Sequence, residues 1–258
     1  MRLNDRWKSV FKNDSYRIKV SGPCDALIKI YLSNILSYEI LSVIKKHNCQ
    51  LILDFGAGGG KYAVPIAYRG YEVHALDLSE HVLESLKKYQ QEIEHYTKRK
   101  LNIKIINGDI MQLKTKEIYD FIFSVGVMEH FLDNKFRSSV IKKQALLLKR
   151  GGVIMTIVPS GVHPLRKIFR KNKLAGYDIP EIDYTKEILF SDFSQHGLKV
   201  TRIYGYNLFG HLVYKPTGPL LHLFYRLFHL IFHLTEPIYT EDFKYKNSYV
   251  LICISRKV

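Results

Sequence analysis

The chain alternates between short, continuous apolar runs and longer segments with helical periodicity. Seven runs have the length of a strand: Leu51–Phe55, Glu72–Leu76, Ile103–Ile106, Asp120–Val125, Val153–Val158, Val200–Tyr206 and Ser248–Ser255. Helices are predicted between them over Tyr62–Tyr68, Glu80–His95, Asn134–Lys149 and Thr185–His196, with Ser79 as a cap and Gly151-Gly152 as a stop. Because continuous apolar strands separated by helices are typical of a sheet covered on both faces, the pattern predicts a doubly wound α/β domain with a largely parallel sheet.

Two regions lie outside this alternation. Residues 1–48 have a mostly helical pattern and are expected to form an N-terminal cap or lid, whereas residues 49–258 are expected to form the core. Within the core, about 160–184 and 207–247 are expected to be inserts, because they interrupt the regular exchange of strands and helices.

A glycine-rich turn follows the first predicted strand, in Asp54-Phe-Gly56-Ala57-Gly58-Gly-Gly60. Glycines at alternate positions let the backbone turn sharply and approach a ligand closely. Asp77 ends the second predicted strand, where a carboxylate can accept both hydroxyls of a ribose. Ligands of doubly wound sheets bind at the carboxyl ends of the strands, so the turn and the acid predict a nucleoside site.

Two nucleoside cofactors compete for this site. Gly58, Gly60 and Ala63 also satisfy the dinucleotide pattern G-x-G-x-x-A, and Asp77 suits the ribose of NAD equally well. Asp54 favours the other candidate, because a carboxylate there would repel a pyrophosphate and attract the ammonium or sulfonium of S-adenosylmethionine. Asp109 adds a third acid after the third strand, placed to meet an adenine edge.

The stretch from Leu51 to Leu83 resembles class I S-adenosylmethionine-dependent methyltransferases, whose first motif is (D/E)-x-G-x-G-x-G. The resemblance extends to about Pro159, since Ser124–His130 is similar to the family's fourth motif and Leu148–Gly152 to its entry into the fifth strand. It implies a Rossmann-like seven-stranded sheet whose last strand is antiparallel, with S-adenosylmethionine as the cofactor. The residues that it assigns to the cofactor are Asp54, Gly56, Ala57, Gly58, Gly60, Asp77, Leu78, Asp109, Ile110, Ser124 and Val125.

Candidate catalytic residues follow the fourth strand, where the methyl group should point. His130 is the candidate general base, which is needed only if the nucleophile carries a proton of high pKa, and Glu129 is a candidate orienting residue. The alternative interpretation is a loop that closes the floor of the pocket. His229 and His233 are four residues apart, but neither an H-E-x-x-H motif nor a third ligand accompanies them, so no metal is expected.

Composition narrows the class of protein further. Of 258 residues 47% are hydrophobic, which excludes a disordered polyelectrolyte. Three distant cysteines argue against a disulfide scaffold and a zinc ribbon, and the N-terminus has no apolar run typical of a signal peptide, so we expect a cytoplasmic protein. The net charge of +15 is compatible with binding to nucleic acid, binding to an anionic membrane, or solubility alone.

The two inserts bear on the acceptor of the methyl group. Residues 163–174 are basic and amphipathic, and residues 220–234 form a dense apolar pattern too short to cross a bilayer, so both are candidates for peripheral membrane contact or for covering an apolar pocket. We therefore expect methyl transfer to an oxygen or nitrogen of a small molecule, either hydrophobic or linked to lipid or glycan. An RNA methyltransferase that uses the basic surface is the alternative, although no Asn/Asp-Pro-Pro-aromatic motif supports it. A non-catalytic, cofactor-binding partner protein is the third.

Overall fold

A computed structural model describes residues 17–32, 35–113, 118–171, 179–208, 227, 231 and 234–258. It contains one seven-stranded sheet with the strand order β3-β2-β1-β4-β5-β7-β6. The strands are β1 (Leu51–Phe55), β2 (Glu72–Asp77), β3 (Ile103–Asn107), β4 (Tyr119–Val125), β5 (Leu148–Pro159), β6 (Leu198–Leu208) and β7 (Ser248–Lys257). Because β7 runs antiparallel to both neighbours and the other pairings are parallel, the predicted fold class is confirmed.

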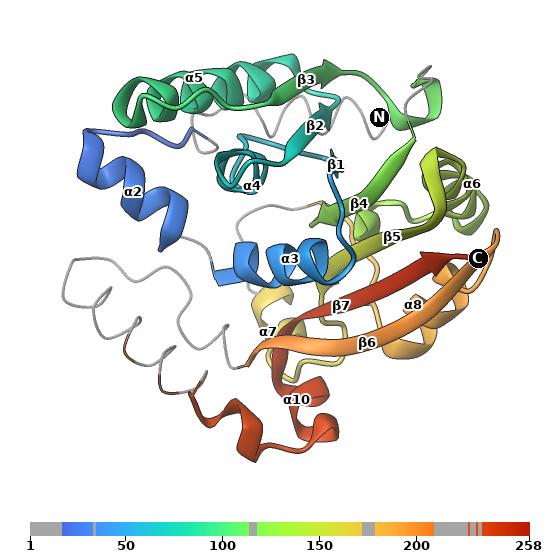
Figure 1. Ribbon diagram of the computed structural model, residues 1–258. Helices are drawn as coiled ribbons and strands as arrows, with labels where there is room; N and C mark the ends of the chain where they lie inside the picture. The colour runs from blue at the N-terminus through green and yellow to red at the C-terminus, as the bar shows by residue number, and fades with distance from the viewer. Residues whose placement is uncertain are drawn as a thin grey trace.

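Helices cover both faces of the sheet (Figure 1). On one face lie α2 (Pro23–Tyr31), α3 (Ile35–Lys46), α4 (Ala63–Tyr68) and α5 (Glu80–Thr97), and on the other lie α6 (Asn134–Leu147) and α8 (Lys186–Phe193). Each strand supplies both cores: in β1, Ile52 packs in the first and Leu53 in the second, and neither is exposed. This two-sided burial explains why the strands are continuous apolar runs.

The shorter elements lie mainly near the ends of the strands. They are the single-turn helices η2 (Ile110–Gln112), η3 (Met128–His130) and η5 (Glu236–Ile238), and the short helices α7 (Arg166–Lys171) and α10 (Glu241–Asn247). Of these, η3 and α7 contribute to the candidate site below.

The prediction that Gly151-Gly152 ends the helix after β4 is wrong. α6 ends at Leu147, and both glycines lie inside β5. Leu148 pairs with Tyr119, and the register then shifts so that Val153 pairs with Phe121. A Cβ on Gly152 would lie 2.9 Å from the carbonyl oxygen of Lys149, so the glycine is required by the bulge in this strand.

Ser79 occupies the predicted position before α5 but does not cap it with its side chain. Its backbone N–H donates instead to Asp77 Oδ1, at 2.9 Å. The start of α5 is therefore fixed by the bond between the Ser79 backbone and Asp77 at the end of β2. The Ser79 hydroxyl makes no capping bond.

The N-terminal region and the inserts are described in part. α2 and α3 pack on α4, α5 and the sheet, whereas residues 1–16, 33–34 and most of 220–234 lie outside the described residues. Within the described chain no single helix has the length and apolarity to cross a membrane, although α2 and α3 together, bent by 64°, pass by length and composition. The division at residue 48 and the membrane contact of 163–174 and 220–234 stay predictions.

Candidate functional site

The glycine turn connects β1 to α4 and is bonded to β2. The N–H groups of Gly56 and Ala57 both donate to the carbonyl oxygen of Leu76, at 2.9 and 3.0 Å. Gly56, Gly58 and Gly60 have φ angles of +81°, +54° and +82°, in the region that L side chains rarely adopt. A Cβ on Gly56 would lie 2.4 Å from a methyl group of Val127, whereas the nearest atom to a Cβ on Gly58 would be 4.0 Å away. Gly56 is therefore required by packing, and Gly58 leaves open space at the turn.

Asp77 joins the end of β2 to this turn. Its Oδ2 accepts the N–H of Gly58 and its Oδ1 accepts the N–H of Ser79, both at 2.9 Å. Burial raises the pKa of Asp77, and these backbone donors counteract the rise. Since each carboxylate oxygen has a second lone pair, Asp77 can accept ribose hydroxyls while it holds the turn.

Asp54 and Ser124 are buried polar residues on the neighbouring strands β1 and β4, each 1% exposed. Among the described residues, neither Asp54 Oδ2 nor Ser124 Oγ has a hydrogen-bond partner. Burial and the charge of Asp77 raise the pKa of Asp54 well above its usual range. The Asp54 carboxylate also accepts a backbone hydrogen bond from Ala63. Buried oxygens without a partner are costly unless a ligand completes them, so Asp54 Oδ2 and Ser124 Oγ fit the cationic methionine end of S-adenosylmethionine.

The remaining predicted cofactor residues differ in how they are placed. Leu78 is 41% exposed just after β2, and Val125 is half-buried at the end of β4. Asp109 caps η2, because its Oδ1 accepts the N–H of Met111 at 2.9 Å. Ile110 is 2% exposed and packs in the core on the α6 and α8 face, so its backbone is the part available to a ligand.

Glu129 and His130 lie in η3 beyond the end of β4, and both are buried. Within the described chain, the Glu129 carboxylate has no hydrogen-bond partner outside its own residue, and burial raises its pKa to about 8. His130 Nδ1 lies 3.3 Å from the carbonyl oxygen of Pro180, which can only accept, so Nδ1 carries the proton and Nε2 is the basic nitrogen.

Burial also lowers the pKa of His130, and its Nε2 lies 3.9 Å from Glu129 Oε1. Near neutral pH the pair is therefore mainly an uncharged imidazole beside an uncharged carboxylic acid. An uncharged imidazole whose Nε2 can accept a proton has the form that a general base requires.

Residues 179–184, which end the insert predicted at about 160–184, cover this pair, although no residue among them was predicted to belong to the site. The N–H of Ile182 donates to the carbonyl oxygen of Glu129 at 2.8 Å, and Tyr184 is bridged to Ser160 at the end of β5. A Cβ on Gly161 would lie 2.4 Å from the carbonyl carbon of Asp183, so this glycine allows the segment to approach. A glycine directly after the fifth strand was the available sequence signal.

Arg166, at the start of α7, binds two acids of the covering segment. Its Nη2 lies 2.6 Å from Glu181 Oε2 and its Nε lies 3.0 Å from Asp183 Oδ1. The side chains of Arg166 and Glu181 are 13% and 14% exposed, so Arg166 is not the surface cation that the basic pattern of 163–174 suggests. Nothing in the local sequence pattern connects Glu181 to η3.

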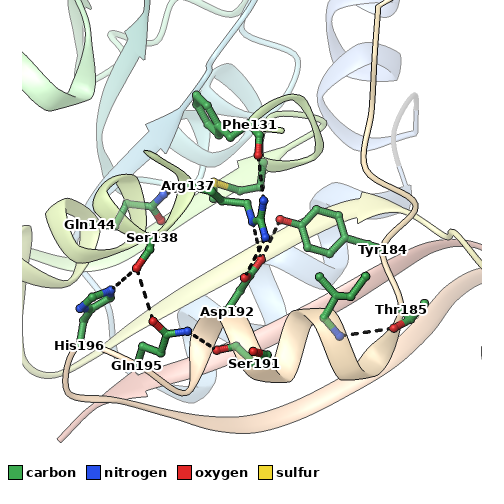
Figure 2. A network of polar contacts seen from close by, with 12 residues as sticks. Phe131, Arg137, Ser138, Gln144, Tyr184, Thr185, Ser191, Asp192, Gln195 and His196 are labelled. Atoms are coloured by element: carbon green, nitrogen blue, oxygen red, sulfur yellow. Dashed lines mark hydrogen bonds and ion pairs between the residues drawn. The ribbon is translucent and has the colours of Figure 1, made fainter. Parts of the chain in front are cut away.

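Arg137 of α6 and Asp192 of α8 connect these two helices to the end of η3 (Figure 2). The buried Arg137 binds Asp192 through two contacts, at 2.7 and 3.2 Å, and donates to the carbonyl oxygen of Phe131 at 3.0 Å. The hydroxyl of Tyr184 donates to the same Asp192, at 3.2 Å. The Arg137–Asp192 pair therefore links the end of η3 to the end of the covering segment.

Glu129, His130 and Glu181 meet at this point from two distant parts of the chain. One donor atom from each residue lies within 4.8 Å of the other two. Such a cluster is compact enough to share a proton or a cation, and the expectation that the protein uses no metal stays a prediction.

Comparisons with known proteins agree with this architecture. A family model described as a methyltransferase domain matches residues 52–152. The ubiquinone biosynthesis O-methyltransferase of Rickettsia akari is 30% identical over 99 residues, which are 37% of each chain. That of Rickettsia typhi is 28% identical over 149 residues, covering 56% of this chain and 53% of the relative. The chain thus matches about half or less of the length of these curated relatives.

Among solved structures, magnesium protoporphyrin IX methyltransferase from Synechocystis PCC 6803, with bound SAH, superimposes with a TM-score of 0.57 at 14% identity. The match covers 98% of this chain and 94% of that one, and at this identity it shows a shared fold. The fold is that of a Rossmann-like methyltransferase. The chain thus contains a match to a methyltransferase domain over residues 52–152, and it shares its fold with methyltransferases solved with bound SAM or SAH.

Proposed function

We propose that this chain methylates a hydroxyl oxygen of a small, largely apolar acceptor. The observation that carries the proposal is the buried Glu129–His130 pair beyond β4, where an uncharged imidazole keeps Nε2 as its basic nitrogen. A base of this kind suits an acceptor such as a phenol, whose proton is held with a pKa near 10. The printed names of the curated relatives, which are O-methyltransferases, support the same reaction class.

The cofactor would be held at the glycine turn. Asp77 would accept the ribose hydroxyls, Asp54 would face the methionine ammonium, and Leu78 and Asp109 would bound the adenine. When bound, S-adenosylmethionine supplies an electrophilic methyl group on a sulfonium and leaves as S-adenosylhomocysteine. The chain itself then contributes alignment and a proton acceptor.

The acceptor's hydroxyl proton is taken up by His130 of η3. The hydroxyl proton of the acceptor passes to His130 Nε2 as the acceptor oxygen becomes bonded to the methyl carbon, and His130 later releases that proton to water. Glu129, uncharged near neutral pH, can donate a hydrogen bond to the acceptor. Phe131, the next residue, stacks on Phe55 and contacts the half-exposed Phe136, so apolar surface adjoins the pair.

The test combines cofactor binding with methyl transfer. Transfer of label from S-adenosylmethionine to a panel of small phenols and aliphatic alcohols should occur with the wild-type chain, and Asp77→Ala should weaken cofactor affinity about tenfold or more. Asp133→Ala, which removes an acid that caps α6, is the matched control and should leave affinity unchanged.

Unchanged affinity of Asp77→Ala would contradict the ribose assignment. Label transfer to bulk RNA but not to the panel, with a steep dependence on salt, would replace the small-molecule acceptor by RNA. Cofactor binding without transfer to any acceptor would favour a non-catalytic partner protein.

A further inference from the structure

Glu181 is the one residue of the Glu129–His130–Glu181 cluster that comes from outside η3. It lies about fifty residues along the chain, in the covering segment, and reaches the cluster because that segment is bonded to η3 at two points. These are the bond from Ile182 N–H to the carbonyl oxygen of Glu129 and the contact of His130 Nδ1 with Pro180. The position of Glu181 is therefore fixed by backbone contacts on both sides.

Arg166 fixes the side chain of Glu181 as well. The guanidinium lies 2.6 Å from Glu181 Oε2, and both side chains are largely buried. A charge-assisted bond of this length between two largely buried side chains restricts the carboxylate to one orientation. The cluster thus contains an anion held in place beside a group that changes its charge.

The charged and titratable groups around His130 come from three elements. Glu129 lies on η3 itself, Glu181 lies on the covering segment, and Arg166 lies on α7. Tyr184 ends the covering segment, and its hydroxyl donates to Asp192. The negative charge of Glu181 favours the protonated imidazole, and Arg166 opposes it from farther along the same ion pair. Asp183 binds Arg166 too, but its side chain is 45% exposed and it is not in the cluster.

We propose that Glu181 is a positioning residue of the acceptor site, which stabilises His130 in the charged form that arises when it accepts the acceptor's proton. This inference rests on the proposed function, since it gives His130 the role of base. A fixed anion of this kind lowers the energy of the developing imidazolium without taking the proton itself.

Glu181→Gln tests the proposal with Asp183→Asn as its matched control. Both substitutions remove one negative charge from a partner of Arg166, and both keep the size of the side chain. We expect Glu181→Gln to lower kcat by about tenfold to a hundredfold and Asp183→Asn by less than about twofold. Cofactor affinity should stay close to the wild-type value in both, whereas Tm should fall more in Glu181→Gln, because the pair that it breaks is the more buried one. Glu181→Asp, which retains the charge, should recover part of the lost kcat.

A second measurement does not need turnover. In NMR titrations of His130, its protonation midpoint should move to lower pH by about half to one unit in Glu181→Gln and should not move in Asp183→Asn. This measurement separates the proposed function from the role of Glu181. If the wild type transfers no methyl group but the His130 midpoint still moves in Glu181→Gln, only the proposed function is contradicted.

Three outcomes would overturn the proposal. Equal losses of kcat in Glu181→Gln and Asp183→Asn would mean that the Arg166 ion pairs act on stability only. An unmoved His130 midpoint in Glu181→Gln would mean that the charge does not reach the imidazole. Binding of Mn²⁺ to the wild-type protein that Glu181→Gln abolishes and Asp183→Asn retains would make Glu181 a cation ligand instead.

Discussion

The glycine turn and η3, the proposed cofactor and acceptor sites, both lie at the carboxyl ends of the parallel strands but are held in different ways. At the turn, both oxygens of Asp77 accept backbone N–H groups from residues within the first two strand–helix units. At η3, the Glu129 carboxylate has no such donor from another described residue, and the backbone is held by α6, α8 and residues 179–184. The glycine turn is fixed by local backbone conformation, whereas η3 is fixed by contacts between elements that are distant in the chain. Cofactor binding should therefore be separable from turnover.

The largest expected effect is on turnover alone. His130→Ala should lower kcat by about 10²–10⁴ and change cofactor affinity by less than about threefold, because the proposed function assigns the imidazole to the acceptor site only. His196→Ala, which removes an exposed histidine bonded to Ser138, is the control for loss of an imidazole. A pH–rate profile in His130→Ala that matches the wild type would remove its role as base.

The next largest effect is expected at Gly56, where the glycine turn contacts the residue before η3. Gly56→Ala should destabilise the chain by about 3 kcal/mol and weaken cofactor binding, because its Cβ would overlap Val127, the residue before η3. Gly197→Ala has a similar φ of +73° and nothing within 4 Å, so it should cost only about 1 kcal/mol. Urea unfolding measures both, and equal losses would show that strain rather than the contact with Val127 matters.

A third effect is the dependence of stability on pH that the buried Glu129 of η3 causes. The pKa of Glu129 is raised from 4.5 to about 8, so its contribution to stability is full below pH 4.5 and is lost as pH rises through 8. The wild type should lose up to about 1.4 kcal/mol per pH unit in this window relative to Glu129→Gln.

The pKa of Asp120 is shifted in the opposite direction to that of Glu129, so its contribution to stability depends on pH in the opposite way. Backbone donors and Lys149 lower its pKa despite partial burial, so its contribution is present above the usual aspartate pKa and is lost as pH falls. Asp120→Asn should therefore be destabilised at neutral pH and approach the wild type in acid. Unfolding midpoints measured across pH would contradict both assignments if the two variants followed parallel curves.

The smallest expected effect concerns a helix start beside the cofactor turn. Ser79→Ala should change stability by less than about 0.5 kcal/mol, because its hydroxyl makes no capping bond. Asp133→Ala should cost about 1 kcal/mol, since Asp133 Oδ1 accepts the N–H of Phe136 at 2.7 Å. A larger loss in Ser79→Ala would show that its hydroxyl, and not the Asp77 bond, fixes the start of α5.

The same contrast explains which parts could be predicted from the sequence. Asp54, the glycines and Asp77 are close in the chain and each obeys a local rule of turn or strand end, so spacing alone predicted that they lie together. Glu129 and His130 could be placed after β4, but their burial and altered pKa depend on residues 179–184. Glu181 and Arg166 were missed because an ion pair between segments separated by the covering loop has no periodic signature.

The misassigned glycines show a related limit. Gly151-Gly152 has the composition of a helix stop, and the same residues serve equally well as a bulge in a strand. The choice between the two depends on whether Leu148 finds a partner in Tyr119, which is a tertiary contact. Local propensity was sufficient to predict that β5 exists, and insufficient to predict where it begins.

The order of the last strands also has a consequence for how this fold can be altered. β6 ends at Leu208 and β7 begins opposite it at Ser248, so the connection between them leaves and re-enters the sheet at the edge that carries Asp77 and η3. A connection from another protein can therefore replace residues 209–247 without cutting the sheet, if it restores the packing of α10 on β6 and the bond from Lys186 N–H to the Tyr245 hydroxyl. A chimera built at these two junctions should keep its cofactor and change the molecules that it accepts.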